Sequence, residues 1–121
     1  MSQPTPAPRR RLIITVCPNE PGTVVLPVER GGPRRRLDAR AILRELQALV
    51  ARGNLEAVVR VREGCAGGCH GRGPNVSLTI HAMPAPGERP DNVAIGWRTY
   101  VDALDTVHHL AEIVEASLLP R

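Results

Sequence analysis

The chain has 121 residues, a formal net charge of +4 and 42% hydrophobic residues, a size and composition that fit one compact domain. Only 2% of the residues are aromatic, so the core must be built from Leu, Val, Ile and Ala. The same shortage disfavours a nucleic-acid-binding module, because such modules stack bases on exposed aromatic side chains that lie among basic ones.

The first eleven residues are predicted to form a disordered tail, because Pro, Ser and Thr dominate them and a short run of arginines closes them. They lack the apolar stretch of a signal peptide, and no apolar run in the chain is long enough to span a bilayer, so we expect a cytoplasmic protein. The folded domain is expected over residues 12–121. It begins with a β-branched run, residues 12–16, which predicts a buried strand that ends at Cys17 and Pro18.

A long connection, residues 19–36, follows this strand and is rich in proline and glycine. A loop of this length is uncommon in a compact domain and is often functional; within it, residues 23–28 predict a short extended piece. A helix is then predicted from Asp38 to Arg52, because apolar residues recur there at helical spacing. Asp38 can cap its N-terminus, and Gly53 stands where a glycine commonly ends a helix.

Three further strands and a closing helix are predicted beyond that helix. The strands cover residues 56–62, 75–83 and 93–101, where apolar and polar side chains alternate, and the last two can pair as a hairpin. The helix covers residues 104–118. Since a strand–helix–strand unit favours a right-handed parallel crossover, we expect an α/β fold: a mixed four-stranded sheet with helices packed on it.

The stretch EGCAGGCHGRGPN places Cys65 and Cys69 in a glycine-rich loop after the second sheet strand. An odd number of cysteines argues against a framework of disulfides, and in a reducing compartment spaced cysteines more often bind metal or do redox chemistry. If residues 12–16 and 56–62 form parallel neighbours, Cys17 lies at the same sheet edge as this loop. Thiolates ligate iron–sulfur clusters and zinc; the alternative is a buried apolar Cys17 and an ordinary turn.

The order of elements and the cysteine loop resemble the thioredoxin-like 2Fe–2S ferredoxins. LIITVCPNEPG is similar to the strand that ends in that family's first cysteine, and EGCAGGCHGRGPNVSLTI is similar to its cysteine loop and the strand after it. The resemblance covers roughly Leu12 to Leu118. It implies a thioredoxin-like fold, a 2Fe–2S cluster with Cys17, Cys65 and Cys69 as three of its four ligands, and electron transfer to a partner protein rather than enzymatic turnover. It also implies a homodimer.

The family's second cysteine has no counterpart here, because residues 19–36 contain neither Cys nor His. One interpretation is a non-cysteine ligand: His70, since imidazole replaces thiolate in Rieske centres, or Glu20 or Glu29, although carboxylates are poor partners for soft metals. In a second interpretation, two subunits share a site. In a third, the cluster is lost and the chain is a cluster-free or zinc-binding module that binds a protein partner.

The remaining histidines and the arginine run have simpler interpretations. His81 is expected on the polar face of its strand, and His109 on the solvent side of the last helix. The arginines at 34–36 form either a solvated collar before the first helix or a docking patch for an acidic redox partner. A disulfide cycle between Cys65 and Cys69 is disfavoured, because their spacing differs from the usual C-x-x-C.

Overall fold

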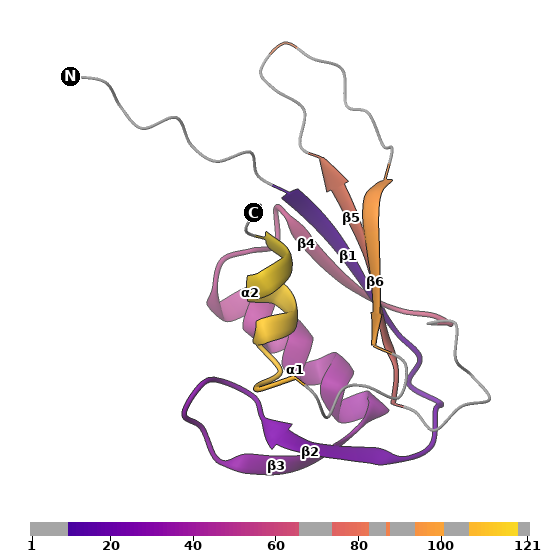
Figure 1. Ribbon diagram of the computed structural model, residues 1–121, viewed down its shortest axis with the longest axis vertical. Helices are drawn as coiled ribbons and strands as arrows, with labels where there is room; N and C mark the ends of the chain where they lie inside the picture. The colour runs from indigo at the N-terminus through magenta and orange to yellow at the C-terminus, as the bar shows by residue number, and fades with distance from the viewer. Residues whose placement is uncertain (1–9, 66–73, 83–86, 88–93, 101–106, 119–121) are drawn as a thin grey trace.

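The computed structural model describes residues 10–65, 74–82, 87, 94–100 and 107–118 (Figure 1). Its main sheet has four strands in the order β4-β1-β5-β6. These are β1 (Arg10–Val16), β4 (Val59–Glu63), β5 (Val76–Ala82) and β6 (Ala94–Tyr100). β1 pairs parallel with β4 and antiparallel with β5, and β5 pairs antiparallel with β6. The mixed four-stranded sheet and the parallel crossover are therefore as predicted.

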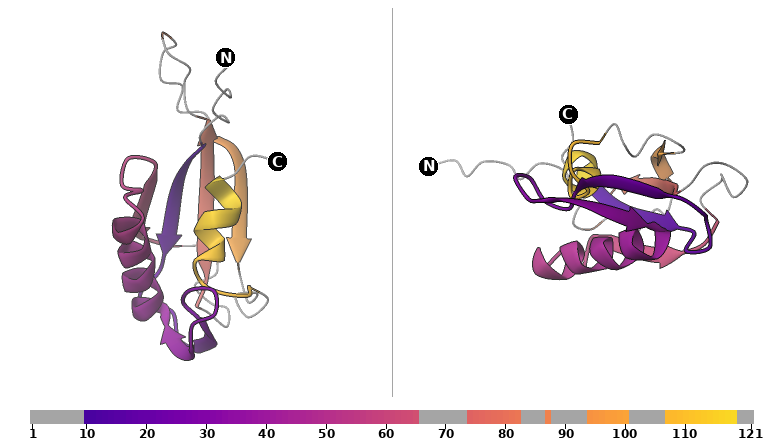
Figure 2. Two further views of the ribbon diagram at one scale, coloured as in Figure 1. Left: turned by 90° about the vertical axis from the view of Figure 1, so that its left-hand side faces the viewer. Right: turned by 90° about the horizontal axis from the view of Figure 1, so that it is seen from below.

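Both helices, α1 (Ala39–Arg52) and α2 (Glu112–Leu118), lie side by side on one face of this sheet (Figure 2). Because side chains alternate between the two faces of a strand, that face carries every second residue of the central strands. One buried cluster joins the strand residues Leu12, Ile14, Val16, Val76, Leu78 and Ile80 to Ile42, Leu46, Val50, Leu110, Ile113 and Val114. The core is aliphatic, as the composition requires. No helix in the described ranges is both long and apolar enough to cross a membrane.

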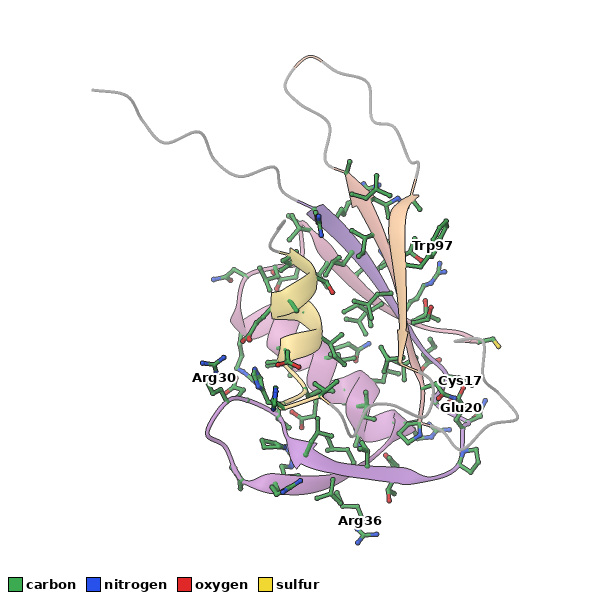
Figure 3. All side chains as sticks on the ribbon, in the orientation of Figure 1. Cys17, Glu20, Arg30, Arg36 and Trp97 are labelled. Carbon is green, nitrogen blue, oxygen red and sulfur yellow. The ribbon has the colours of Figure 1, made fainter. Side chains whose placement is uncertain are left out.

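The other face of the sheet is not covered by either helix. Its residues include Ile13 and Thr79, which are only half-buried, and Trp97 of β6, which pairs with Thr79 across the strands. Trp97 is 71% exposed and Ile95, two residues before it on the same face, is 54% exposed. Figure 3 shows Trp97 pointing away from the body of the protein.

Residues 19–36 hold a β-hairpin where the sequence predicts mainly a loop. β2 (Thr23–Pro27) pairs antiparallel with β3 (Arg34–Asp38), and Gly31, with φ at 79°, lies in the turn between them. The extended piece expected at residues 23–28 is confirmed. β3 escapes detection because its only buried side chain is Leu37, which leaves no alternation to see.

The hairpin packs below the helices and closes the core from that side. Leu26 and Leu37 are almost completely buried. The backbone N–H groups of Leu110 and Ala111 donate to the carbonyl oxygens of Pro27 and Val28 at 2.8 and 2.9 Å. The hairpin is therefore joined to the segment that leads into α2, although the two are far apart in sequence.

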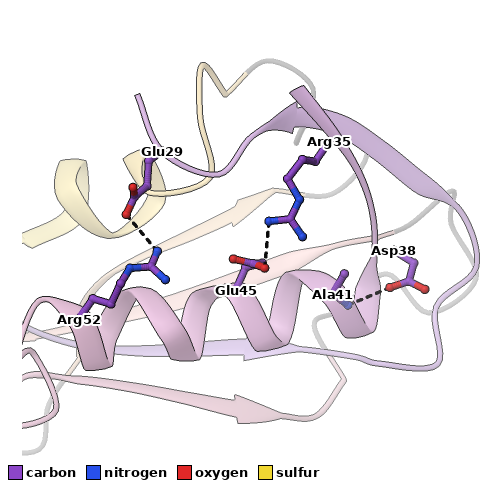
Figure 4. A network of polar contacts seen from close by, with 6 residues as sticks. All are labelled: Glu29, Arg35, Asp38, Ala41, Glu45 and Arg52. Carbon is purple, nitrogen blue, oxygen red and sulfur yellow. Dashed lines mark hydrogen bonds and ion pairs between the residues drawn. The ribbon is translucent and has the colours of Figure 1, made fainter. Parts of the chain in front are cut away.

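Helix α1 begins where the sequence predicts and is tied to the hairpin by polar contacts (Figure 4). Asp38 is its N-cap: the Oδ1 atom accepts a hydrogen bond from the backbone N–H of Ala41 at 2.8 Å. Two ion pairs, Arg35–Glu45 at 3.1 Å and Arg52–Glu29 at 3.0 Å, join the hairpin to the helix. Both pairs are largely exposed, so they add little stability.

The C-terminal part of the chain differs from its prediction. Of the described residues of the expected helix, 112–118 are helical and 107–111 form bends and turns. The helical spacing that put His109 in solvent therefore does not apply. His109 is 3% exposed and its Nε2 atom lies 3.1 Å from Glu115 Oε2. His81 is also buried, at 9% exposed, next to a register shift between Ile80 and His81. The predictions of solvent-facing histidines are wrong; residues 104–106 lie outside the described ranges.

Replacing Asp38 by Ala should lower the free energy of unfolding by about 1 kcal/mol, because the N–H of Ala41 loses its acceptor. Asp38→Asn keeps a capping oxygen and should stay within a few tenths of a kcal/mol of the wild type. Urea unfolding followed by circular dichroism measures both. Equal stability of the Ala variant and the wild type would show that the Asp38 cap does not stabilise the protein.

Candidate metal centre

The candidate site lies where β1 and β4 end. The parallel register pairs Leu12 with Val59 at one end of the ladder and Val16 with Glu63 at the other. One further hydrogen bond extends the ladder: the Gly64 N–H donates to the Val16 carbonyl oxygen at 3.1 Å. Cys17 and Cys65 are the next residues of the two segments, so both lie at the same edge of the sheet.

Gly64 lies at a close approach of the two strands. A Cβ atom on Gly64 would meet the Thr15 Cγ2 atom at 3.1 Å, which is closer than nearly all real contacts of this kind. The Thr15 hydroxyl oxygen also accepts a hydrogen bond from Arg62 Nε at 3.1 Å. Thr15 of β1 therefore contacts both Arg62 and Gly64, the residues of the neighbouring segment that lead to Cys65.

The two cysteines differ in exposure. Cys17 is partly buried and Cys65 is exposed, so the edge reaches from the margin of the core to the protein surface. Cys69 and His70 lie outside the described residues. Of the three cysteines that the sequence proposes as ligands, the structure places Cys17 and Cys65 at the same sheet edge.

A buried carboxylate stands beside Cys17. The backbone N–H of Glu20 donates to the Cys17 carbonyl oxygen at 3.4 Å, which closes a turn, and Figure 3 shows the two residues close together at this end of the sheet. Glu20 is only 6% exposed. Its Oε2 atom accepts two hydrogen bonds from Asn75, from the backbone N–H at 2.8 Å and from Nδ2 at 2.7 Å.

Asn75 contacts this carboxylate, and the sequence did not predict that role. It is 0% exposed, it comes directly before β5, and its two bonds to Glu20 span 55 residues. A fully buried Asn at the start of a strand is hard to distinguish from a turn residue in the sequence. Together with the Gly64–Val16 bond, the contact ties both ends of the segment between Gly64 and Asn75 to the end of β1.

The second oxygen of Glu20, Oε1, is buried and makes no hydrogen bond in the part of the chain that the structure describes. By contrast, Glu29, the other carboxylate considered from the sequence, is exposed and pairs with Arg52 of α1. Of the two, only Glu20 lies at the cysteine edge.

These groups suit a metal centre in their chemistry, although the described ones are not gathered into a finished site. Thiolates bind zinc and iron clusters, and zinc also takes carboxylate oxygen. Among the described residues, no three His, Cys, Asp or Glu side chains form a group able to hold a metal ion. The same residues do place two thiols at one sheet edge and, near Cys17, a buried carboxylate oxygen without a hydrogen-bond partner in the described ranges.

Asn75→Ala should lower the free energy of unfolding of the metal-free protein by about 1–3 kcal/mol, because it leaves a buried carboxylate with one hydrogen bond fewer. Asn19→Ala, at an exposed position close by, is the matched control and should change stability by less than about 0.5 kcal/mol. Both are measured by urea unfolding. Losses of the same size in the two variants would contradict a stabilising role of the Glu20–Asn75 contact.

Comparisons of the chain with protein-family models, with curated proteins and with solved structures find no match. No solved structure therefore supports the thioredoxin-like assignment. What the structure establishes is a mixed α/β fold with a four-stranded mixed sheet and two helices in its described part.

Proposed function

We propose that the chain is a small 2Fe–2S electron-transfer protein with a thioredoxin-like fold, not an enzyme, and that Cys17, Cys65 and Cys69 are ligands of its cluster. The observation that carries the proposal is the parallel pairing of β1 with β4, which puts Cys17 and Cys65 at one edge. These residues are 48 positions apart, and only this topology makes them neighbours. A cytoplasmic location fits the use of cysteines as ligands.

A bound cluster supplies one-electron redox chemistry near the protein surface. The residues of the chain hold and position it. Cys65 provides the exposed side of the edge and Cys17 the partly buried side. Because Cys17 is partly buried, its side of the centre would be shielded from water, and such shielding is one of the factors that set a reduction potential.

The proposed redox partner is an acidic protein that docks on the hairpin. Arg34 and Arg36 are exposed on β3, and Arg36 points away from the body of the protein in Figure 3. Arg35 is less available, because it pairs with Glu45. β2 starts three residues after Glu20, and Val25 of β2 pairs with Arg36 of β3. The basic surface therefore lies on the hairpin that follows the Cys17–Glu20 turn, where electrostatic attraction would orient a partner.

An alternative function is a cluster-free or zinc-binding module that binds a protein partner. The uncovered face of the sheet favours it, because Ile95 and Trp97 are large exposed apolar side chains and such patches mark interaction sites. β6 is also an outer strand of the sheet, with an edge that can pair with another strand. The partner that we assign to this face is a second copy of the chain, and the same homodimer is compatible with the ferredoxin proposal.

The ferredoxin proposal is tested by anaerobic purification, analysis of iron and sulfide, and a visible absorption spectrum. We expect about two irons and two sulfides per chain after reconstitution. Cys17→Ser should abolish or alter the visible spectrum, because it removes a thiolate. A colourless wild-type protein that takes up no iron would reject the cluster, and zinc at about one per chain would support the alternative.

The dimer is tested with Trp97, the only tryptophan in the chain. Sedimentation should show a dimer. The fluorescence emission of Trp97 should shift to shorter wavelength as the protein concentration rises, because the indole leaves water when the dimer forms. Trp97→Glu should give a monomer. Val25→Glu, at another exposed apolar position on the hairpin, is the control and should still dimerise. A monomeric wild type, or dimers in both variants, would contradict this interface.

A further inference from the structure

We propose that Glu20 is a ligand of the centre and takes the place of the missing fourth thiolate, with its Oε1 atom as the donor. The inference rests on the proposed function, because it assumes a metal or cluster at the edge that carries Cys17 and Cys65. It deepens that function by assigning the fourth ligand to one carboxylate oxygen.

The burial of Glu20 requires an explanation. Glutamate is almost never fully buried unless it is paired, because an uncompensated charge away from water is costly. Glu20 is 6% exposed and only Oε2 has partners, both from Asn75. Oε1 is buried with no hydrogen-bond partner in the described part of the chain. A metal ion or cluster iron would supply the missing interaction.

The position of Glu20 agrees with this role. Its backbone is in the turn that begins at Cys17, so it moves with one proposed ligand. Its side chain is held by Asn75, where the chain returns to the sheet after the segment that contains Cys65. The carboxylate therefore connects the two parts of the chain that bring thiols to this edge. With Oε2 fixed by two hydrogen bonds, Oε1 is the oxygen left to bind.

Other candidate groups lie elsewhere. Glu29 is paired with Arg52 at 3.0 Å, and its side chain is 59% exposed. His81 is buried with no partner on either ring nitrogen within the described residues, but it pairs in register with Arg11 near the start of β1, whereas the cysteines follow Val16 at the other end. Glu20 is thus the orphaned donor at the correct end of the strand.

A carboxylate oxygen is an unusual but chemically sound replacement. Zinc accepts Asp and Glu oxygens beside thiolates, and iron–sulfur centres accept a non-thiolate ligand, with a raised reduction potential, in Rieske proteins. Because the described donors do not yet form a group around one point, binding must turn side chains at this edge toward the metal. An oxygen in place of a thiolate should also shift the potential relative to an all-sulfur ligand set, because the donor atom changes.

The experiment compares iron content, visible spectrum and reduction potential of the full chain after anaerobic reconstitution with iron and sulfide. Glu20→Gln keeps the shape and an acceptor oxygen for Asn75 but is a poor ligand. Glu20→Cys supplies a thiolate but cannot reproduce the contact with Asn75. Glu29→Gln is the matched control. A ligand role predicts that Glu20→Gln loses at least about tenfold in iron affinity. Under the same role, Glu20→Cys binds iron with a changed spectrum and a shifted potential, and Glu29→Gln behaves as the wild type.

A purely structural role predicts the reverse, with Glu20→Gln unchanged and Glu20→Cys impaired, and that result overturns the inference. Loss of iron in both Glu20 variants overturns it as well. X-ray absorption at the iron edge of the wild-type protein is independent of whether any variant folds: an oxygen neighbour beside the sulfurs supports Glu20. An all-sulfur shell, or the outer scattering of an imidazole ring, overturns it.

The proposed function can fail separately from this inference. If the wild type binds zinc but no iron, the electron-transfer proposal is rejected. The role of Glu20 is then decided by the zinc affinity of the same variants and by X-ray absorption at the zinc absorption edge. If the wild type binds neither metal, both are rejected.

Discussion

The parallel ladder between β1 and β4 is the constraint on which the candidate site depends. β1 and β4 are neighbours in the sheet and run parallel, with α1 in the crossover between them. Parallel neighbours end at the same edge. The last bond of the ladder, from the Gly64 N–H to the Val16 carbonyl oxygen, determines where both cysteine segments leave the sheet. The pairing of β1 with β4 is the observation that relates Cys17 to Cys65, which are far apart in the sequence.

A buried polar contact adds a second constraint at the same edge. Glu20 and Asn75 are both almost inaccessible to water, and their hydrogen bonds fix the start of β5 against the turn after β1. A protein that needed only stability here would do as well with two apolar residues, since satisfied buried polar pairs contribute little net free energy. Stability does not explain the second oxygen of Glu20, which is buried without a hydrogen-bond partner among the described residues.

The sequence predicts the parts of this structure that are periodic and local. The strand at β1, the α1 helix with its Asp38 cap, and the β5–β6 hairpin all follow from alternation, helical spacing and capping chemistry. β3 was not predicted because three consecutive arginines precede its one buried residue, Leu37, and leave no alternation of polar and apolar residues. His109 was misplaced because residues 107–111 form bends and turns instead of helix, and the backbone N–H groups of Leu110 and Ala111 bond to the hairpin. At the site, topology predicts the meeting of Cys17 and Cys65, but the choice of Glu20 over Glu29 depends on burial and long-range hydrogen bonds, which no local pattern contains.

The most direct test of the shared edge is the rate at which each cysteine reacts with an alkylating reagent, resolved by mass spectrometry, in metal-free and iron-loaded protein. The account predicts that Cys17 and Cys65 are both reactive without metal and that loading protects them together, in the same proportion as iron is bound. Protection of Cys65 while Cys17 keeps its metal-free rate, or no protection of either, would contradict the claim that the ends of β1 and β4 build one centre.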